Sequence, residues 1–409
     1  IGNNMNNITE RNKHEQRFKI YGKLAVSTAV FLLLILLYKI FSTGISAFQQ
    51  TYIGVKVEMQ QTEDISNLDA RQKFREQLRA MFPELTSRSD KRNLYSLFSV
   101  GASYEFDDFL KSNDGKAVDQ YIYFLASDDV DMYIKEKVKK EGDTAGRLSS
   151  SQLKLIDVFK DQNLIKLKLN KYLFTSADSR EPEMAGILGA IIGSFYAILI
   201  AFISAFPIGV LTALYLEKMA KKNKFADIIE TNINNLAAVP SIVFGLLGLA
   251  IFLNFFDLPR SAPLVGGLTL GLMTLPTIVI ASRAAIKSVP PSIEEASIGV
   301  GASKVQTMFN FTLPLAMPGI LTGTIIGIAQ AIGETAPLLM IGMVAFVVDI
   351  PAGPLDAATA LPVQIYLWAD SPERAFVERT SAAIMVLLIF LFILNITAVY
   401  LRKKLEKKW

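Results

Sequence analysis

Six long apolar runs constrain this chain more than any other feature of its sequence. Each is close to the roughly 20 residues that an α-helix needs to cross about 30 Å of hydrocarbon. Because a backbone in hydrocarbon must satisfy its own hydrogen bonds, such runs are expected to be helices. They cover residues 24–40, 184–216, 233–256, 262–285, 316–348 and 381–401, with polar or proline interruptions in the third and fifth. The sequence therefore predicts an all-α polytopic membrane protein with about six transmembrane helices.

Lysine and arginine residues gather at the ends of these runs. The four groups are Arg11, Lys13, Arg17, Lys19 and Lys23; Lys218, Lys221, Lys222 and Lys224; Arg283, Lys287 and Lys304; and Arg402, Lys403, Lys404, Lys407 and Lys408. The positive-inside rule predicts that all four are cytoplasmic, as are both ends of the chain. Residues 1–23 then form a basic cytoplasmic tail and residues 24–41 the first transmembrane helix. The formal net charge of +4 reflects this topology, and no nucleic-acid partner is expected.

The first apolar run allows a second interpretation. A cleavable signal peptide also has a short apolar core followed by small residues, and small residues occur between Ser42 and Ala47. No clear A-x-A cleavage site follows, however, and Lys39 can reach the membrane surface from the end of a retained helix. A retained anchor is therefore the favoured interpretation.

Residues 42–183 form a charged segment between the first and second spans, and we expect an inserted extracytoplasmic α+β domain there. Strands are expected at 52–57 and 165–170, and the alternation of Ile165, Leu167 and Leu169 with polar residues indicates one buried face. The two strands should lie together near the membrane. Helices are expected near 68–82, 91–98, 118–125 and 151–159, and Tyr104, Tyr121, Tyr123 and Tyr133 are interpreted as core residues.

A polar stretch between Pro291 and Pro318 interrupts the apolar runs. Ser292 is a suitable helix N-cap, and Glu294 and Glu295 would then lie in the first turn, where the helix dipole favours negative charge. Gly299 and Gly301 permit a sharp exit from that helix. The pattern predicts a short helix-turn-helix.

One face of this helix is apolar and small. Ile293, Ala296 and Val300 recur at helical spacing, and such a face can enter a groove on another protein.

This stretch resembles the EAA loop of the permeases of ABC importers. The resemblance rests on Glu295-Ala296-Ser297, on Gly301 and on Leu313-Pro314, with Ser297 and Phe311 as mild departures. It implies a cytoplasmic coupling loop at about residues 286–314, within a permease domain of residues 184–409. The residues that it implies for coupling to an ATPase subunit are Glu294, Glu295, Ala296, Gly301, Leu313 and Pro314.

A second run narrows the resemblance. The residues from Gly333 to Leu338, together with 239–245 and 275–277, are similar to phosphate-importer permeases of the PstA type, from about Gly186 to the C-terminus. The resemblance implies a multi-pass permease in a bacterial inner membrane that imports inorganic phosphate. The implied partners are a homologous second permease, an ATPase dimer that binds ATP and Mg²⁺, a periplasmic phosphate-binding protein and membrane lipid. No cofactor is expected in this chain.

Residues in this run and near it form the candidate substrate pathway. Pro207, Pro240, Pro276 and Pro337 interrupt apolar spans, and broken helices often line solute paths. Glu334 is an intramembrane carboxylate, which is usually paired or functional, and Arg283 is its candidate partner and an anion contact. Gln330 and Thr335 would add neutral hydrogen bonds. Many members of the resembled family carry Arg at the position of Gln330.

No catalytic group of residues and no metal site is expected. The chain has no cysteine, its single histidine, His14, lies in the polar tail, and Gly299 to Lys304 lacks the Gly-Lys-Ser/Thr of a phosphate loop. The chain is therefore expected not to be an enzyme. Two alternatives stay open: a permease for another oxyanion such as sulfate or molybdate, and a membrane sensor with an outer ligand-binding domain.

Overall fold

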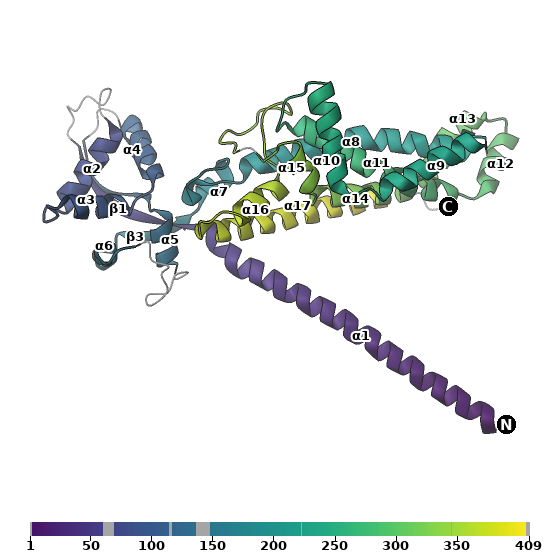
Figure 1. Ribbon diagram of the computed structural model, residues 1–409, viewed down its shortest axis with the longest axis horizontal. Helices are drawn as coiled ribbons and strands as arrows, with labels where there is room; N and C mark the ends of the chain where they lie inside the picture. Colours follow the sequence, from purple (N-terminus) through teal and green to yellow (C-terminus); the bar gives the residue numbers. More distant parts are fainter. Residues whose placement is uncertain are drawn as a thin grey trace.

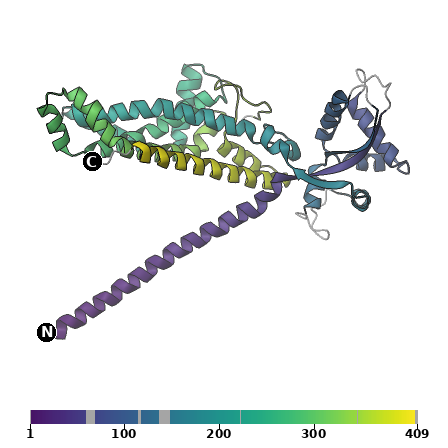
Figure 2. The ribbon, with the colours of Figure 1, turned by 180° about the vertical axis from the view of Figure 1, so that it is seen from behind.

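The computed structural model describes residues 2–59, 69–113, 117–135, 148–221, 223–344 and 346–405. In this part of the chain an α+β module lies at one end of a long helical bundle, and the first helix leaves the bundle at an angle (Figure 1). The view from behind shows that the module joins the bundle through a narrow neck (Figure 2). Lys222, Lys407 and Lys408, which belong to the basic groups named above, lie outside the described residues.

Helices make up the whole bundle. The longer ones are α1 (Gly2–Gly44), α8 (Leu188–Leu214), α9 (Lys224–Ala237), α10 (Ser241–Gly248), α11 (Pro263–Lys287), α12 (Pro291–Gly299), α14 (Leu313–Ile332), α16 (Leu361–Ala369) and α17 (Ala375–Leu405). Shorter ones are η1 (Ile45–Phe48), η3 (Pro182–Met184), α13 (Lys304–Thr307) and α15 (Ala336–Met340). Stretches of π-helix, η4 (Tyr215–Met219), η5 (Leu249–Phe255) and η6 (Met308–Thr312), extend α8 and α10 and precede α14.

Five stretches of the described residues are long and apolar enough to cross a membrane: His14–Phe48, Leu188–Met219, Pro263–Lys287, Lys304–Ile332 and Ala375–Lys404. A sixth would come from α9 and α10 together, which are bent by 104°. The prediction of about six membrane helices is thus confirmed. Two of the expected spans are corrected, because 233–256 is broken into two helices and 316–348 loses its helix after Ile332.

The bundle packs around α11, which contacts α8 on one side and α14 on another. Helix backbones can pack close together where small residues lie at the contact. A Cβ atom added at any of five glycines would lie less than 3.0 Å from another element: Gly245, Gly248, Gly266, Gly267 and Gly271. These glycines therefore let neighbouring elements pack closely.

The described residues between 49 and 175 form an α+β module with one antiparallel sheet in the order β2-β1-β3. The strands are β1 (Gln49–Met59), β2 (Val118–Leu125) and β3 (Ile165–Leu169), and the helices are α2 (Ala70–Met81), α3 (Arg88–Tyr95), α4 (Val100–Ser112), α5 (Asp128–Ile134), α6 (Ser150–Asp161) and α7 (Lys171–Thr175). Both expected strands and three of the four expected helices are confirmed within a few residues.

The helix expected at 118–125 is wrong, because this segment is strand β2. It pairs with β1 from Val118 opposite Met59 to Leu125 opposite Tyr52. Its Tyr-Ile-Tyr-Phe sequence suits a pleated, half-buried surface better than a helix. The partner strand lies about 60 residues earlier, so local spacing alone did not identify the pairing.

The module's core lies on one face of this sheet. Phe74, Phe98, Phe106 and Phe124 meet there with ring centroids 5.1 to 5.7 Å apart. The helices of that face do not cover β3, so Leu167 and Leu169 stay 48% and 66% exposed, and the buried face predicted for β3 is wrong.

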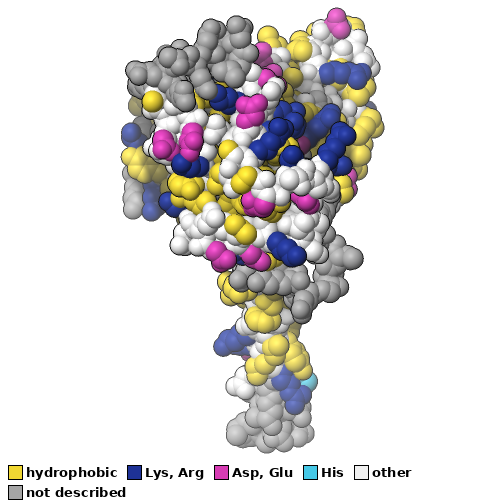
Figure 3. All heavy atoms as spheres, turned by 90° about the vertical axis from the view of Figure 1, so that its left-hand side faces the viewer, with side chains coloured by type: hydrophobic (Ala, Val, Ile, Leu, Met, Phe, Trp, Pro, Cys, Tyr) yellow, Lys and Arg dark blue, Asp and Glu magenta, His cyan; other side chains and the backbone are white. Residues whose placement is uncertain are grey.

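Two of the tyrosines interpreted as core residues are also on the surface. Tyr104 and Tyr121 are 60% and 50% exposed. Seen end on, the module carries Lys and Arg side chains gathered over part of its surface, with Asp and Glu nearby (Figure 3). Such a mixed charged surface suits contact with water.

The neck of the module is a strand pair. Gln49 at the start of β1 lies opposite Leu169 at the end of β3. Next to this pair, the backbone N–H of Asn170 donates to the carbonyl of Phe48 over 2.8 Å. The side chain of Asn170 donates to the carbonyl of Ala47, also over 2.8 Å. The first and last strands of the module therefore pair, as expected, and this pair lies next to the bundle.

A buried charge cluster, which we call the junction, holds the module against α17. Lys135, just after α5, lies 2.6 Å from a carboxylate oxygen of Asp131 and 3.3 Å from one of Glu378 in α17. All three side chains are at most 8% exposed. The second oxygen of Asp131 accepts the backbone N–H of Thr51 in β1 over 2.8 Å. The ion pairs thus join the end of α5 to the bundle, and the hydrogen bond from Thr51 connects β1 to the same cluster.

Glu183 and Arg379 extend the junction. The carbonyl of Glu183 accepts a hydrogen bond from the side chain of Gln50 over 2.8 Å and another from Arg379 over 3.4 Å. Burial raises the pKa of the Glu183 carboxyl to about 7, and a hydrogen bond from Ser99 opposes that rise. Buried charges are stable only when they are paired or hydrogen-bonded, so the position of the module depends on these contacts.

Candidate functional site

Two interrupted helices face each other in the middle of the bundle. The first interruption separates α9 from α10 at Pro240, which has no N–H to continue a helix. The second separates α14 from α15, which carries Pro337 in its first turn. A Cβ atom on Gly245 of α10 would lie only 2.7 Å from the Cα atom of Pro337. The absence of a side chain at Gly245 therefore lets α10 and α15 lie against each other.

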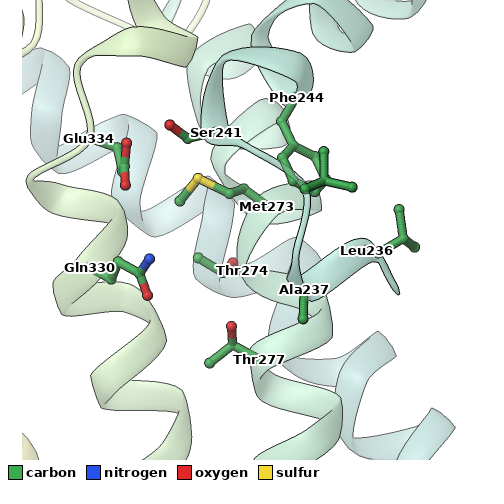
Figure 4. A pocket seen from close by; sticks show the side chains of 10 residues that line it. Leu236, Ala237, Ser241, Phe244, Met273, Thr274, Thr277, Gln330 and Glu334 are labelled. Atoms are coloured by element: carbon green, nitrogen blue, oxygen red, sulfur yellow. The ribbon is translucent and has the colours of Figure 1, made fainter. Parts of the chain in front are cut away.

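A cavity of about 150 Å³ lies beside these breaks (Figure 4). Its lining residues are Leu236, Ala237, Val239, Ser241, Phe244, Met273, Thr274, Thr277, Gln330 and Glu334. In Figure 4, Gln330 and Glu334 lie on one side, and Met273, Thr274 and Thr277 of α11 lie across from them. Three segments distant in the sequence thus supply the polar groups of one cavity.

Among the described residues that line the cavity, Glu334 is the one that carries a charge. Its backbone N–H donates to the carbonyl of Ala331 over 3.2 Å, and its carboxylate makes no ion pair with any of the described residues. Within the described residues, no three Asp, Glu or His side chains come close enough together to hold a metal ion. The cavity therefore offers a single half-buried carboxylate among neutral groups.

The neutral groups of the cavity differ in what they can do. The hydroxyl of Thr274 donates to the carbonyls of Leu270 and Gly271, over 3.0 and 3.2 Å, so its oxygen can only accept further bonds. Ser241 is the first residue of α10, where backbone N–H groups lack partners inside the helix and the dipole is positive. The cavity thus contains both hydrogen-bond donors and acceptors.

The four predicted pathway residues do not all meet. Gln330 and Glu334 line the cavity together, although α14 ends between them. Thr335 is outside the lining and precedes α15 as its cap residue. Arg283 is also outside the lining.

Arg283 is held by other carboxylates. Its guanidinium contacts Glu217 of η4 and lies 2.9 Å from a carboxylate oxygen of Glu230 in α9. Lys287 lies 3.4 Å from the same oxygen of Glu217. The expected pairing of Arg283 with Glu334 is wrong, because two acidic residues near the end of α11 hold the arginine there.

The polar stretch after α11 forms the expected short helix-turn-helix, α12 and α13. Helix α12 begins at Pro291, so Ser292 is not its cap. Gly301 has a φ of +95°, the left-handed region in which a β-carbon is unfavourable. The hydroxyls of Ser297 and Thr307 lie 2.7 Å apart and tie the two helices together.

The acidic residues of α12 have different surroundings. Glu294 pairs with Lys218 of η4 and accepts a hydrogen bond from Thr312 over 3.1 Å, whereas Glu295 is exposed. Leu313 and Pro314 open α14 and are half-buried. Glu294 therefore fixes the turn to the bundle, and Glu295 faces outward.

The outward surface of this turn carries three apolar side chains as well as Glu295. Val300 is 85% exposed, and Ile298 and Val305 are each 49% exposed. Ala296 is exposed as predicted, but Ile293 packs against the bundle core, which corrects the predicted face. Exposed apolar side chains grouped around a rigid turn are typical of a protein contact surface.

Sequence reasoning missed three polar side chains of the cavity as pathway residues: Ser241, Thr274 and Thr277. Ser241 and Thr277 each directly follow a proline that interrupts an apolar run, Pro240 and Pro276. A hydroxyl next to such a proline was the available signal. Thr274 has no comparable signal, because threonine is common inside apolar helices, where it bonds to the preceding turn.

Comparison with known proteins gives two family matches along the chain. Residues 205–408 match the binding-protein-dependent transport system inner membrane component family. Residues 5–144 match a domain of unknown function, DUF3333. The second match covers α1 and most of the α+β module.

Individual relatives agree with the first match. The phosphate transport system permease protein PstA 1 of Mycobacterium tuberculosis (strain CDC 1551 / Oshkosh) is 31% identical over 222 residues, covering 54% of this chain and 72% of the relative. The permease protein PstA of Haemophilus influenzae is 30% identical over 224 residues, covering 55% of this chain and 78% of the relative. The probable ABC transporter permease protein YqgI of Bacillus subtilis is 34% identical over 173 residues, covering 42% and 58%. The chain belongs to the family of binding-protein-dependent transport system inner-membrane components.

Proposed function

We propose that the chain is the transmembrane permease subunit of an ATP-driven importer of inorganic phosphate. The observation that carries this proposal is the polar cavity between two broken membrane helices, in a chain whose relatives include phosphate transport permease proteins. Binding sites of membrane transporters are commonly formed where helices are interrupted, because freed backbone groups can then face a solute. Ser241, Gln330 and the start of α10 supply hydrogen bonds for an anion.

The proposed partners follow from two features: the sequence has no phosphate-loop motif for ATP, and the turn between α12 and α13 exposes apolar side chains. Chemical energy would come from a pair of ATPase subunits that bind ATP and Mg²⁺ and dock on the apolar surface around Val300. A second, homologous permease completes the pathway, and an extracytoplasmic phosphate-binding protein delivers the substrate. In this arrangement the chain itself hydrolyses nothing.

Gly301 provides the test of this docking. Gly301→Val places a β-branched residue at a left-handed backbone position and should distort the turn. We expect the ATPase subunits to detach or uptake to be lost, with the permease still present in the membrane. Gly299→Ala is the matched control, because Gly299 is helical and has open space where its Cβ would lie. Normal uptake by Gly301→Val would remove this coupling role.

The basic groups favour a topology in which both termini and α12 are cytoplasmic and the α+β module lies outside. Because the chain has no cysteine, single cysteines at Asp161 in the module and Lys304 in the turn can be labelled selectively. A membrane-impermeant thiol reagent should label the Asp161 variant in intact cells and the Lys304 variant only after lysis. The reverse pattern would overturn the topology.

The transport proposal is tested by reconstituting the complete complex in proteoliposomes. Phosphate should stimulate ATP hydrolysis and accumulate inside, whereas sulfate and molybdate should do neither. Stimulation by sulfate or molybdate alone would favour the other oxyanion permeases. A complex that signals the presence of a ligand without moving it would favour a membrane sensor.

A further inference from the structure

The cavity poses a problem for an anion site. Its one charged lining residue, Glu334, is negative, and its carboxylate makes no ion pair with any described residue. The candidate cation, Arg283, is occupied by Glu217 and Glu230. A carboxylate without a cation repels an incoming oxyanion, and the repulsion is strengthened where water is partly excluded. The anion must therefore gain something from Glu334 that offsets this repulsion.

An anion that carries a proton can offset this repulsion by donating a hydrogen bond to the carboxylate of Glu334. An ionised carboxylate can only accept hydrogen bonds, and an O–H···O⁻ bond to it is short and strong. Thr274 adds a second acceptor, because its own hydroxyl proton is already donated to the carbonyls of Leu270 and Gly271. An oxyanion that keeps a hydroxyl group satisfies these acceptors, whereas an oxyanion without one leaves them facing its negative oxygens.

The donors of the same cavity suit the remaining oxygens of such an anion. Ser241, Thr277 and the amide of Gln330 can donate, and the first turn of α10 is positively polarised. A lining with donors on some sides and acceptors on others matches a tetrahedral oxyanion that is protonated at one or more corners. At neutral pH phosphate and arsenate are such anions, and sulfate is not.

We propose that Glu334 makes this cavity select oxyanions that carry a proton over those that carry none. The inference rests on the proposed transport function and deepens it, since it names the feature of phosphate that the membrane pathway recognises. Glu334 is then a specificity-determining residue that accepts a hydrogen bond from the substrate hydroxyl, and Thr274 is a second acceptor across the cavity.

The test must separate this cavity from an external binding protein. The permease pair with its ATPase subunits, without the binding protein, is reconstituted, and equilibrium binding of labelled phosphate and labelled sulfate is measured, with arsenate as competitor. The parental complex should bind phosphate and arsenate in preference to sulfate. Glu334→Gln replaces an acceptor with a group that can also donate, so it should lower the phosphate-to-sulfate preference at least tenfold, in part by gaining sulfate binding.

Two further variants define the result. Glu334→Asp keeps the acceptor and should retain a preference for phosphate, and Asp161→Asn in the module should behave as the parent. If Glu334→Gln assembles and keeps the parental preference, or loses both anions equally, the inference is overturned while the phosphate function stands. If the parental complex shows no preference for phosphate over sulfate, the cavity does not select and the inference is overturned as well. The proposed function itself fails only if the complete complex, with its binding protein, neither accumulates phosphate nor hydrolyses ATP in response to it.

Discussion

The junction and the cavity both hold carboxylates away from bulk water, but only the junction pairs them. At the junction, Glu378 and Asp131 share Lys135, and all three side chains are at most 8% exposed. In the cavity, Glu334 has open space beside it and no cation among the described residues. The burial of a charge therefore does not by itself identify a functional site in this protein.

What separates the two regions is whether the carboxylate already has its partners. A paired charge stabilises one arrangement of the elements that supply it, and removing one partner leaves another charge buried alone. An unpaired carboxylate beside a cavity contributes little to the fold and is free to bind a ligand. The comparison predicts opposite responses to mutation, in stability at the junction and in binding at the cavity.

The largest loss of stability is expected for Lys135→Met. It leaves Asp131 and Glu378 buried without their cation, which typically costs about 3–5 kcal/mol. Thermal unfolding in detergent, followed by the fluorescence of Trp368 in a Trp409→Phe background, would report the loss, because Trp368 packs near the junction against Phe376. Lys154→Met, at an exposed position of α6, should change stability by less than about 0.5 kcal/mol.

The next largest effect is a pH dependence at Glu183. Burial raises the pKa of its carboxyl from 4.5 to about 7, so the folded state binds a proton more tightly than the unfolded state does. The stabilisation is complete below pH 4.5 and is lost as pH rises through 7, up to about 3 kcal/mol. Glu183→Gln should flatten this slope in thermal unfolding between pH 5 and 8, and Glu181→Gln should not. An unchanged slope in Glu183→Gln would show that its carboxyl is not the titrating group.

A smaller effect is expected for Arg283→Gln. It removes contacts to Glu217 and Glu230, but Glu230 is 46% exposed and Lys287 still lies near Glu217, so about 1–2 kcal/mol should be lost. The preference for phosphate over sulfate should stay at the parental value in the binding assay. A changed preference would show that Arg283 acts on the cavity after all. Lys287→Gln, which alters a 61% exposed side chain, should cost less than about 1 kcal/mol.

The smallest change in stability is expected for Glu334→Gln. Because its carboxylate has no ion pair among the described residues, unfolding should shift by less than about 0.5 kcal/mol. Glu378→Gln, which removes the same charge at the junction, should be clearly less stable in the same unfolding assay. Equal losses in the two variants would erase the distinction between the two regions.

Local sequence patterns predicted much of the bundle. Apolar length identified the membrane helices, and the pattern from Glu295 to Gly301 predicted the turn between α12 and α13, including the left-handed glycine. These features depend on residues close together in the chain. For the same reason Gln330 and Glu334, four residues apart, were placed in one site.

Long-range contacts account for the errors. Strand β2 was missed because its partner β1 lies about 60 residues away, and the exposed leucines of β3 were assigned to a core that stops short of them. The partner of Arg283 was also mistaken. Glu217 and Glu230 lie more than 50 residues before it, and only the packing of η4 and α9 against α11 brings them together.

The neck of the module has a consequence for how such a chain could be assembled or trimmed. The chain enters and leaves the module at two points that are hydrogen-bonded to each other, Phe48 and Asn170. Excision of everything between them would need only a short connecting turn, and the bundle's own path would be unbroken. The path of the chain would therefore allow the module to be removed as one insert. The ion pair at the junction opposes such a removal, because Glu378 of α17 would lose its partner Lys135. A shortened chain would therefore need a substitution at Glu378 as well as a new turn.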